Sequence, residues 1–445
     1  MTASSQRAQQ LRAEFAHVIE PGWRRRILPI TLALIGLAYF GYLMVYFDVA
    51  WVGDRWRSDR AQLFILDTYA YKVHVDTRWR DTSRLKASLE GSRWERYETL
   101  PDFVTPLGDT HHRIDFGEDG HIVIGPDTVK LFFAGVAPMV ARYIEGKRPS
   151  LSSVGELPDW AMVSKSKLDV RPTTHSRVQI TKSKITVHRY FNGWEYFWFD
   201  FESPLRDVPI LDAIGLAFSD QRVDAAQSNL SLVAGEIWHN KLWLHRDVYI
   251  ALLQTVFMAV MGTLMAAVLA LPLAFIAAYN VTPIGAVRFV LRRLFDTLRG
   301  IDMLIWSLIF IRAFGMGPFS GLLAIGVTDT GTLGKLMSEA IENIDKKQVE
   351  GVQSTGGNSL QRHRFGILPQ ILPLFISQTL YYLESNTRGA VVIGAMGAGG
   401  IGLQFLGAMR TGTSWENVAY ISLIVLITVI GMDMLSARLR RMLIQ

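Results

Sequence analysis

Two long stretches of this chain contain no charged residue, and no other feature restricts its fold as strongly. Residues 27–47 form one uncharged run of 21 positions, and residues 249–287 form another of 39 positions. About 20 consecutive apolar residues are enough for a helix to cross the hydrocarbon core of a bilayer. Both runs therefore predict membrane-spanning helices, and further apolar stretches follow at residues 301–311, 313–328, 365–383, 389–409 and 417–432.

The positions of Lys and Arg predict how these helices are oriented, because short loops rich in these residues stay in the cytoplasm. Arginines precede the first span, follow the second, occur within residues 338–364 and recur near the C-terminus. If residues 338–364 and the C-terminal arginines are both cytoplasmic, the chain must cross the membrane an even number of times between them. Gly315, Gly317 and Pro318 are expected to break the region after Arg299 into two spans. We therefore expect six transmembrane helices with both termini in the cytoplasm. Residues 389–409 are then the end of the fifth helix and a glycine-rich outside or re-entrant segment.

This topology divides the chain into four parts. Residues 1–26 form a cytoplasmic segment, residues 27–47 the first transmembrane helix, residues 48–247 an extracytoplasmic inserted domain, and residues 248–445 the remaining five helices with a cytoplasmic loop at residues 338–364. The net charge of +6 says little about nucleic acid, because the basic residues cluster at the membrane ends. Interfacial tryptophans are expected at the opposite ends of the spans, namely Trp51, Trp56, Trp238, Trp243 and Trp415.

The inserted domain has short alternating segments and turn signals, which predict a β-rich or α+β module. Asn192-Gly193 predicts a hairpin between residues 184–191 and 194–201, and Glu118-Asp119-Gly120 is a weaker hairpin signal. Eight aromatic residues between Tyr190 and Phe201 favour a hydrophobic core over a docking surface. The chain has no Cys, so a disulfide or a thiolate metal site is excluded. His111, His112 and His121 are interpreted as loop residues and not as metal ligands.

Residues 338–364 form a charged island that leads into Leu368-Pro369. Glu350, Gly356 and Leu368-Pro369 have the spacing of the loop by which ABC-importer permeases bind their ATPase: E-A-A, three residues, Gly, nine residues, I-x-L-P. Glycines at 351 and 366 and a valine at 352 depart from that pattern. Glycine allows a sharp turn between short helices, and a proline can start the next helix. We expect an ATPase-coupling element built from Glu339, Glu342, Glu350, Gly351, Gly356, Arg364, Leu368 and Pro369; the alternative is an ordinary polar loop.

Two motifs invite an enzyme interpretation. Gly397, Gly399, Gly400 and Gly402 match G-x-G-x-x-G, but a dinucleotide fold would need a βαβ unit around them. Because they lie between predicted spans, close helix packing or backbone flexibility is the better interpretation. Residues 331–336 resemble a phosphate loop but lack its first glycine and its Ser or Thr. The sequence therefore indicates no nucleotide site in this chain.

From residue 249 to residue 441 the chain resembles the permease subunit of phosphonate-type ABC importers. The resemblance rests on five blocks in order: F-D-x-x-R-G-I-D-M-L-I-W at residues 295–306, T-G-T-L-G-K-L at 330–336, E-A-I-E-N-I-D at 339–345, L-Y-Y-L-E-S-N-T-R at 380–388 and G-A-G-G-I-G at 397–402. Most of residues 48–247 is an insertion relative to shorter relatives.

The resemblance implies a type I importer permease with six transmembrane helices in the bacterial cytoplasmic (inner) membrane. It implies a homodimer of this chain with two cytoplasmic ABC ATPase subunits, which hold the ATP and Mg, and with an extracytoplasmic phosphonate-binding protein. The transported substrate would be a phosphonate or a related phosphorus oxyanion such as phosphate or phosphite.

Ionisable residues within spans are costly and tend to face a cavity or a partner. Candidates for the translocation path are therefore Asp302 near the start of the third span, Arg312 and Asp329 flanking the third and fourth, and Glu384, Asn386 and Arg388. Glu384 and Arg388 are four residues apart and can pair, and a guanidinium suits a phosphonate by its bidentate geometry. The alternative is that Glu384 and Arg388 form a structural ion pair.

Two other functions are alternatives to transport. A membrane-anchored receptor or scaffold would account for the large inserted domain but not for the five ordered blocks. A dinucleotide-dependent membrane enzyme rests on the glycine motif alone. Co-purification with an ATPase would separate transport from both.

Overall fold

The structure is a computed structural model that describes residues 23–49, 51, 62, 65–90, 95–153, 157–411 and 415–444. It divides into two units, one up to Phe64 and one from Ile65 onward. In the first unit, helix α3 (Trp23–Tyr46) contains the predicted first span, and residues 27–46 meet the length and hydropathy of a membrane helix. Trp56 and residues 1–22 lie outside the described residues.

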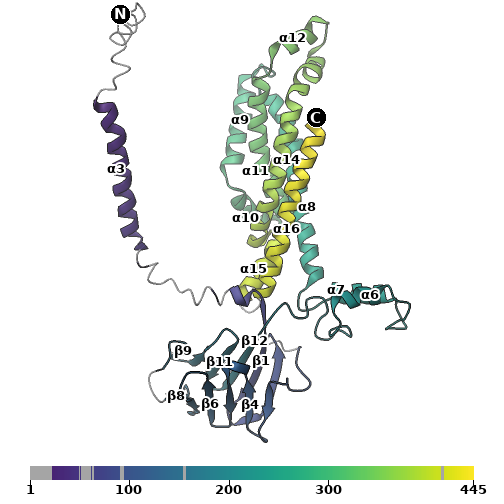
Figure 1. The fold of residues 1–445 in the computed structure, drawn as a ribbon. Helices are drawn as coiled ribbons and strands as arrows, with labels where there is room; N and C mark the ends of the chain where they lie inside the picture. Colours follow the sequence, from purple (N-terminus) through teal and green to yellow (C-terminus); the bar gives the residue numbers. More distant parts are fainter. Residues whose placement is uncertain are drawn as a thin grey trace, which may run out of the picture. The chain divides into compact units, whose positions relative to one another are not determined.

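The second unit begins with a β domain made of two antiparallel six-stranded sheets (Figure 1). In sheet A the order is β2 (Asp81–Leu89), β1 (Ala70–Arg78), β12 (Lys184–Asn192), β11 (Ser176–Thr181), β10 (Lys167–Val170) and β9 (Ala161–Val163). In sheet B the order is β3 (Val104–Pro106), β4 (His112–Asp115), β5 (Gly120–Ile124), β6 (Thr128–Phe133), β7 (Met139–Arg142) and β8 (Ser150–Ser153), with the short η1 (Gly117–Asp119) before β5.

The two sheets enclose one hydrophobic core. Alternate residues of β11 are buried, and fully buried side chains from both sheets, such as Ile180, Ile122 and Leu131, belong to the same cluster. This alternation is the period of a sheet with one solvated face. The prediction of a β-rich inserted domain is therefore confirmed for the part between residues 70 and 192.

One of the two predicted hairpins is wrong. Residues 184–192 do form β12, but residues 194–201 form no strand, and β12 pairs instead with β1 and β11. Gly193 does adopt a positive φ of 120°, so the turn signal is real, but its N–H donates to the carbonyl of Tyr69. The weaker signal is confirmed, because β4 and β5 form an antiparallel pair around η1.

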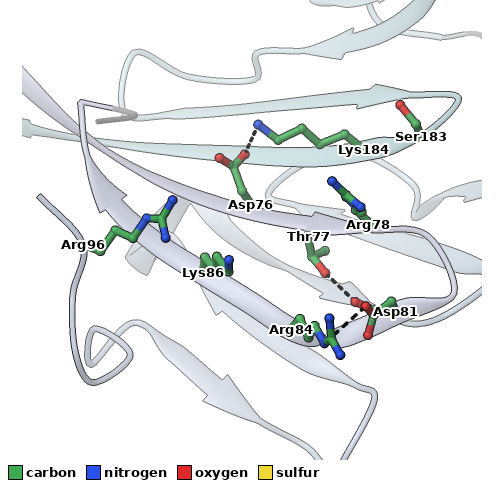
Figure 2. A pocket seen from close by; sticks show the side chains of 9 residues that line it. All are labelled: Asp76, Thr77, Arg78, Asp81, Arg84, Lys86, Arg96, Ser183 and Lys184. Carbon is green, nitrogen blue, oxygen red and sulfur yellow. Dashed lines mark hydrogen bonds and ion pairs between the residues drawn. The ribbon is translucent and has the colours of Figure 1, made fainter. Parts of the chain in front are cut away.

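A cavity of about 790 Å³ opens beside β1, β2 and β12 of sheet A (Figure 2). Its lining is dominated by basic side chains. Sequence reasoning did not single out these residues, because they lie on different strands.

The rest of the second unit is helical. Two short helices come first, α6 (Ile210–Ala217) and α7 (Asn229–Trp238). The long helix α8 (His245–Ala277) follows. The remaining helical segments are α9 (Gly285–Gly300), α10 (Met303–Phe314), α11 (Pro318–Glu342), α12 (Lys346–Ser354), α13 (Ser359–Gln361), the π-helical η2 (Arg362–Ile367), α14 (Leu368–Ile393), η3 (Gly394–Ala398), α15 (Ile401–Thr411) and α16 (Trp415–Ile444).

Three of the described helices, α3, α8 and α16, are long and apolar enough to cross a membrane. The number is four if α14 and α15, which bend by 60° at the glycine-rich segment, count as one span. The predicted break at Gly315, Gly317 and Pro318 separates α10 from α11. However, α10 has 12 residues, about 18 Å of helix, which is shorter than a hydrocarbon core of about 30 Å.

The second uncharged run is not one helix. Helix α8 ends at Ala277, and Asn280 donates to the carbonyl of Ile341, which ties the following turn to the end of α11. The chain then enters α9, which carries the arginines expected to flank the span. Helices α8 and α11 approach closely, since a Cβ at Gly262 would lie 2.8 Å from Ile325. Small residues allow such contacts between membrane helices.

The aromatic stretch after β12 packs against the first turns of two long helices. Trp194 and Phe197 contact Trp243 and Tyr420, with ring centroids 4.8–6.3 Å apart. This confirms a core role for part of the stretch, while Trp198 is exposed. Trp243 is only 4% exposed, so its interpretation as an interfacial tryptophan is wrong: it fills a protein core.

Candidate coupling and translocation sites

The predicted coupling loop is a pair of short helices joined by a turn. Helix α12 ends at Ser354, and Gly356 follows with a φ of +84°, a conformation that side chains disfavour. Asn358 then starts α13 with a capping box in which its side chain and that of Gln361 bond each other's backbone N–H. Pro369 lies in the first turn of α14, as predicted.

Helix α12 packs on η2 through a glycine. A Cβ at Gly366 would lie 3.1 Å from the Cα of Val349, which is tighter than ordinary contact. Gly366 occupies the position where the coupling pattern has isoleucine. The departure from the pattern thus has a structural reason: in this chain the second helix lies against the backbone of α12.

The outer surface of this loop exposes both charged and apolar groups. Glu350, Gly351 and Arg364 are exposed, and the carboxylate of Glu350 has no partner in the described part of the chain. Leu360 is 74% exposed and Phe365 is 59% exposed. Leu368 is half-buried, beside an apolar groove of about 610 Å³ between this loop and the end of α8.

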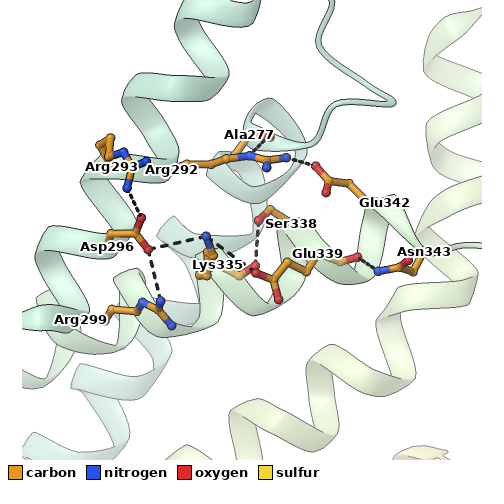
Figure 3. Close-up of polar contacts among 10 residues, drawn as sticks. All are labelled: Ala277, Arg292, Arg293, Asp296, Arg299, Lys335, Ser338, Glu339, Glu342 and Asn343. Atoms are coloured by element: carbon orange, nitrogen blue, oxygen red, sulfur yellow. Dashed lines mark hydrogen bonds and ion pairs between the residues drawn. The ribbon is translucent and has the colours of Figure 1, made fainter.

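Glu339 and Glu342 are not part of the loop. They lie on the last turns of α11, which continues to Glu342 because Glu339 and Glu342 are held by cations (Figure 3). Glu342 is ion-paired with Arg292 of α9. Lys335 lies 3.8 Å from Glu339 and 3.6 Å from Asp296 of α9. The first residues of the predicted coupling element, 338–342, thus belong to α11, and a separate short helix begins at Lys346.

Asp296 is the centre of this network and was missed from the sequence. Its carboxylate oxygens lie 3.2 Å from both Arg293 and Arg299 on α9, in addition to the contact with Lys335 of α11 (Figure 3). The spacing of Arg292, Arg293, Asp296 and Arg299 at three and four residues would have indicated a helix with paired charges. The network joins α9 to α11 beside the coupling loop.

A buried polar cluster lies where α8, α11 and α14 meet. Asp329 is 3% exposed and Asn386 is 1% exposed. The amide nitrogen of Asn386 donates to the carboxylate of Asp329 and, at 2.8 Å, lies within reach of the hydroxyl of Thr263. Asp329 was expected to flank a span but lies in the middle of α11, and Thr263 was not predicted. The structure thus brings two of the six path candidates into direct contact.

Glu384 and Arg388 form the ion pair that their spacing predicts. Arg388 Nη1 lies 2.9 Å from Glu384 Oε1. The side chain of Arg388 is 51% exposed and that of Glu384 is 18% exposed. The pair therefore lies on the surface of the single chain, on the same helix as Asn386 but on a different face.

The two remaining path candidates lie at opposite ends of α10. Asp302 is the N-cap of this helix and accepts from the backbone N–H of Leu304 at 2.8 Å, so a capping role explains it. Arg312 is exposed in the last turn, where a cation is favourable near the carboxyl end of a helix. Neither residue contacts the buried cluster.

The glycine-rich segment is a sharp bend and not a nucleotide loop. Gly397, Gly399 and Gly400 have positive φ values of 115°, 80° and 71°. A Cβ at Gly402 would lie 1.9 Å from the carbonyl oxygen of Val391. Thr255 of α8 accepts from the N–H of Ile401 at 2.8 Å. No βαβ unit surrounds the motif, since helices precede and follow it, so close packing accounts for these glycines.

The described residues contain no group of three or more His, Asp or Glu that could hold a metal ion. His112 is buried, and its Nε2 lies 2.9 Å from the carbonyl oxygen of Thr82. His112 and His121 belong to strands β4 and β5 and not to loops.

The family comparison concerns the helical part. The sequence profile of the family described as "Binding-protein-dependent transport system inner membrane component" matches residues 270–444. The putative cryptic phosphonate transport system permease protein PhnE2 of Escherichia coli (strain K12) is 44% identical over 120 residues, which are 27% of this chain and 98% of that protein.

Two longer relatives match over more of this chain. The phosphite transport system permease protein PtxC of Stutzerimonas stutzeri is 38% identical over 38% of this chain, and the phosphate-import permease protein PhnE of Mycolicibacterium smegmatis is 37% identical over 39%. The chain spans 62% and 32% of their respective lengths. A solved inward-facing MetNI methionine ABC transporter aligns with 44% of this chain and 95% of its own chain, at 17% identity and a TM-score of 0.40.

The profile match covers the segment that carries the five ordered blocks, and PhnE2 is matched over 98% of its own length. They confirm the resemblance to phosphonate-type ABC permeases predicted from the sequence. The chain belongs to the family of binding-protein-dependent transport system inner membrane components.

Proposed function

We propose that this chain is the membrane-spanning permease subunit of an ATP-driven ABC importer that moves a phosphonate or a related phosphorus oxyanion, phosphate or phosphite, by alternating access. The observation that carries the proposal is the coupling loop. A short helix, a turn at Gly356 and a second helical segment expose Leu360 and Phe365 beside the ends of the long helices. Exposed apolar groups on a charged loop are typical of a docking surface.

The substrate class rests on the relatives and on the chemistry of the candidate path. The three relatives are named for phosphonate, phosphite and phosphate transport. Arg388, whose side chain is 51% exposed, offers a permanent guanidinium on α14, the helix that carries Asn386 of the buried cluster on another face. A guanidinium can bind two oxygens of a phosphorus oxyanion at once.

The partners follow from the same proposal. Two cytoplasmic ABC ATPase subunits, with ATP and Mg, would bind α12 and the segment after Gly356, through Glu350, Gly351 and Arg364. A second copy of this chain would complete the path, and an extracytoplasmic binding protein would deliver the substrate. Glu342 would then act indirectly, by holding α9 against α11. Glu339 would do so through Lys335, which also contacts Asp296 of α9.

We also propose six crossings of the bacterial cytoplasmic membrane, with both termini in the cytoplasm and residues 48–247 outside. Helix α10 alone is short, but α9 and α10 follow each other with only residues 301 and 302 between them. Together they would form one broken crossing, with the arginines of α9 toward the cytoplasm. Helices α14 and α15 would form another broken segment at the glycine-rich bend.

The decisive experiment is reconstitution. The chain is co-expressed with its ATPase and binding protein, purified and placed in proteoliposomes. Ligand-loaded binding protein should stimulate ATP hydrolysis, and labelled phosphate, phosphite or methylphosphonate should accumulate. Failure to co-purify any ATPase, with a folded chain, would favour the receptor or scaffold function instead.

The orientation has its own test, because the chain has no native Cys. A single cysteine at Asn192 should react with a membrane-impermeant maleimide in intact spheroplasts. A cysteine at Gln348 on α12 is the matched control and should react only after lysis. The reverse pattern would overturn the orientation.

A further inference from the structure

The cavity beside β1, β2 and β12 has no role in coupling or in the candidate path. Five basic side chains line it, from Arg78, Arg84, Lys86, Arg96 and Lys184 (Figure 2). They come from three strands and from the segment after β2. A volume of about 790 Å³ is within the range of pockets that hold small ligands.

The cavity has more positive than negative charge. Its two carboxylates belong to Asp76, whose Oδ1 lies 2.9 Å from Lys184 Nζ, and to Asp81, whose Oδ2 lies 3.6 Å from Arg84 Nε. Five cations and two anions leave a formal charge of +3. Within the described ranges, no ion pair joins Arg78, Lys86 or Arg96 to an acid, although Asp81 and Asp76 lie across the strands from Arg78 and Lys86. These three side chains are therefore available to an anion.

The strand pairing brings these cations together at a cost. Arg78 of β1 is directly opposite Lys184 of β12, and like charges in that position destabilise a sheet. On the other side Arg78 is opposite Asp81 of β2, which offsets part of that cost. The register of β1 with β2 also shifts between Asp76 and Arg78. Such irregularities redirect side chains and are common next to binding sites. A bound anion would offset the repulsion between these cations.

We propose that this cavity binds a phosphorus oxyanion that retains one proton, such as hydrogen phosphate or a phosphonate monoanion. The guanidinium groups of Arg78 and Arg96 can each bind two oxygens. The carboxylates of Asp76 and Asp81 can accept the remaining O–H of the ligand. Sulfate and phosphodiesters have no such proton and would meet only repulsion from these carboxylates. The inference rests on the lining residues and is independent of the transport function proposed above.

The test uses the full-length protein in nanodiscs of phosphatidylcholine. Isothermal titration with inorganic phosphate at pH 7 should show saturable binding. The variant R78Q/K86Q/R96Q should weaken it by at least about tenfold, because charge-assisted hydrogen bonds are lost. The variant K130Q/R142Q/K147Q removes the same charge from exposed positions that do not line the cavity, and it should leave the affinity within about twofold.

Selectivity gives a second measurement. Sulfate at the same ionic strength should bind at least about tenfold more weakly than phosphate. The variant Asp81→Asn should reduce this difference between the affinities for phosphate and sulfate. The proposal is overturned if both triple variants weaken phosphate binding equally or if sulfate binds as tightly as phosphate. It is also overturned if the protein binds phosphatidylglycerol vesicles but not free phosphate. If the triple variant does not fold, Arg96→Gln alone, outside the regular strands, must still weaken binding. Uptake by the reconstituted complex is recorded separately, so a failure of transport leaves the phosphate titration valid.

Discussion

The imidazole Nδ1 of His245 lies 2.7 Å from the hydroxyl oxygen of Tyr420, which bonds the first turn of α8 to α16. The other ring nitrogen, Nε2, lies 2.6 Å from the carbonyl oxygen of Phe197. A carbonyl can only accept, so in the neutral ring Nε2 donates to Phe197 and Nδ1 accepts from Tyr420. His245 is 2% exposed. One buried histidine therefore joins the segment after the β domain to two long helices.

Tyr420→Phe should test this junction, because it removes the hydroxyl and keeps the ring. We expect a loss of about 1 kcal/mol of stability, measured by thermal unfolding of the purified protein. Tyr381→Phe, on an exposed ring, is the control and should change nothing. An unchanged melting temperature for Tyr420→Phe would mean that the bond makes no net contribution.

Gly356→Val should uncouple the transporter while the protein still inserts. The φ of +84° at this position costs a β-branched residue roughly 1–3 kcal/mol of local strain, so the turn between α12 and α13 should change. The measurement is ATP hydrolysis stimulated by loaded binding protein. Gly235→Ala on α7, away from the coupling loop, is the control, since a Cβ there meets nothing within 4 Å. Normal stimulation by an assembled Gly356→Val complex would contradict the proposed coupling role.

Asn386→Leu should destabilise the membrane core. It leaves the buried carboxylate of Asp329 without its amide donor, at a cost of roughly 1–3 kcal/mol for an unsatisfied group. Assembly yield and thermal unfolding report the loss. Asp329→Asn combined with Asn386→Leu removes the acid as well and should recover much of the stability. If the single and double variants are equally unstable, the cost comes from packing and not from the carboxylate.

Glu384→Leu combined with Arg388→Met separates the two roles of this ion pair. Arg388 is half exposed in the single chain, so the pair should contribute little to the stability of an isolated subunit. We expect the double variant to assemble but to lose phosphonate uptake, and Glu384→Gln alone to alter uptake with the fold intact. Full uptake by the double variant would show that the charges are structural and that the path does not need them.

The β domain should lose stability in mild acid because of two stacked histidines. His74 of β1 and His188 of β12 have ring centroids 4.2 Å apart. Burial, together with the charge of Lys72, lowers the pKa of His74 to about 4, and burial next to His74 lowers the pKa of His188 to about 2. The unfolded chain takes up these protons near pH 6.5, so the stabilisation is complete above that pH and falls as the pH drops toward 4.

Hydrogen exchange of residues 70–192 in the full-length protein at pH 7 and pH 4.5 measures this effect. For His74 alone, the decrease in the free energy of unfolding should approach about 3 kcal/mol as the pH falls toward 4. His74→Gln combined with His188→Gln should flatten the pH dependence, while His111→Gln, on an exposed site of the same domain, should leave it steep. An equally steep dependence in the double variant would assign the acid sensitivity to other groups.

Local patterns in the sequence were sufficient for several elements. The uncharged runs predicted α3 and α8, Gly315 and Pro318 predicted the break between α10 and α11, and Gly356 predicted the turn after α12. Each of these features depends on residues next to one another in the chain. Their physical causes, the membrane length of an apolar run and the φ preference of glycine, act over a few residues.

Other features depend on partners that are distant in the sequence. Nothing in residues 184–201 shows that β12 pairs with β1, more than 100 residues earlier, and not with the segment after Asn192. Likewise, the burial of Asp329 follows from Asn386 of α14 and Thr263 of α8, which reach it only when three helices pack.

The sequence by itself therefore determined the family, the positions of the apolar helices and the turns. The tertiary structure decided which strands pair, which charges are neutralised and which remain free in the cavity of sheet A. The physical reason is that the free energy of a charge or a strand edge depends on its neighbours in space, and these neighbours come from segments far apart in the chain.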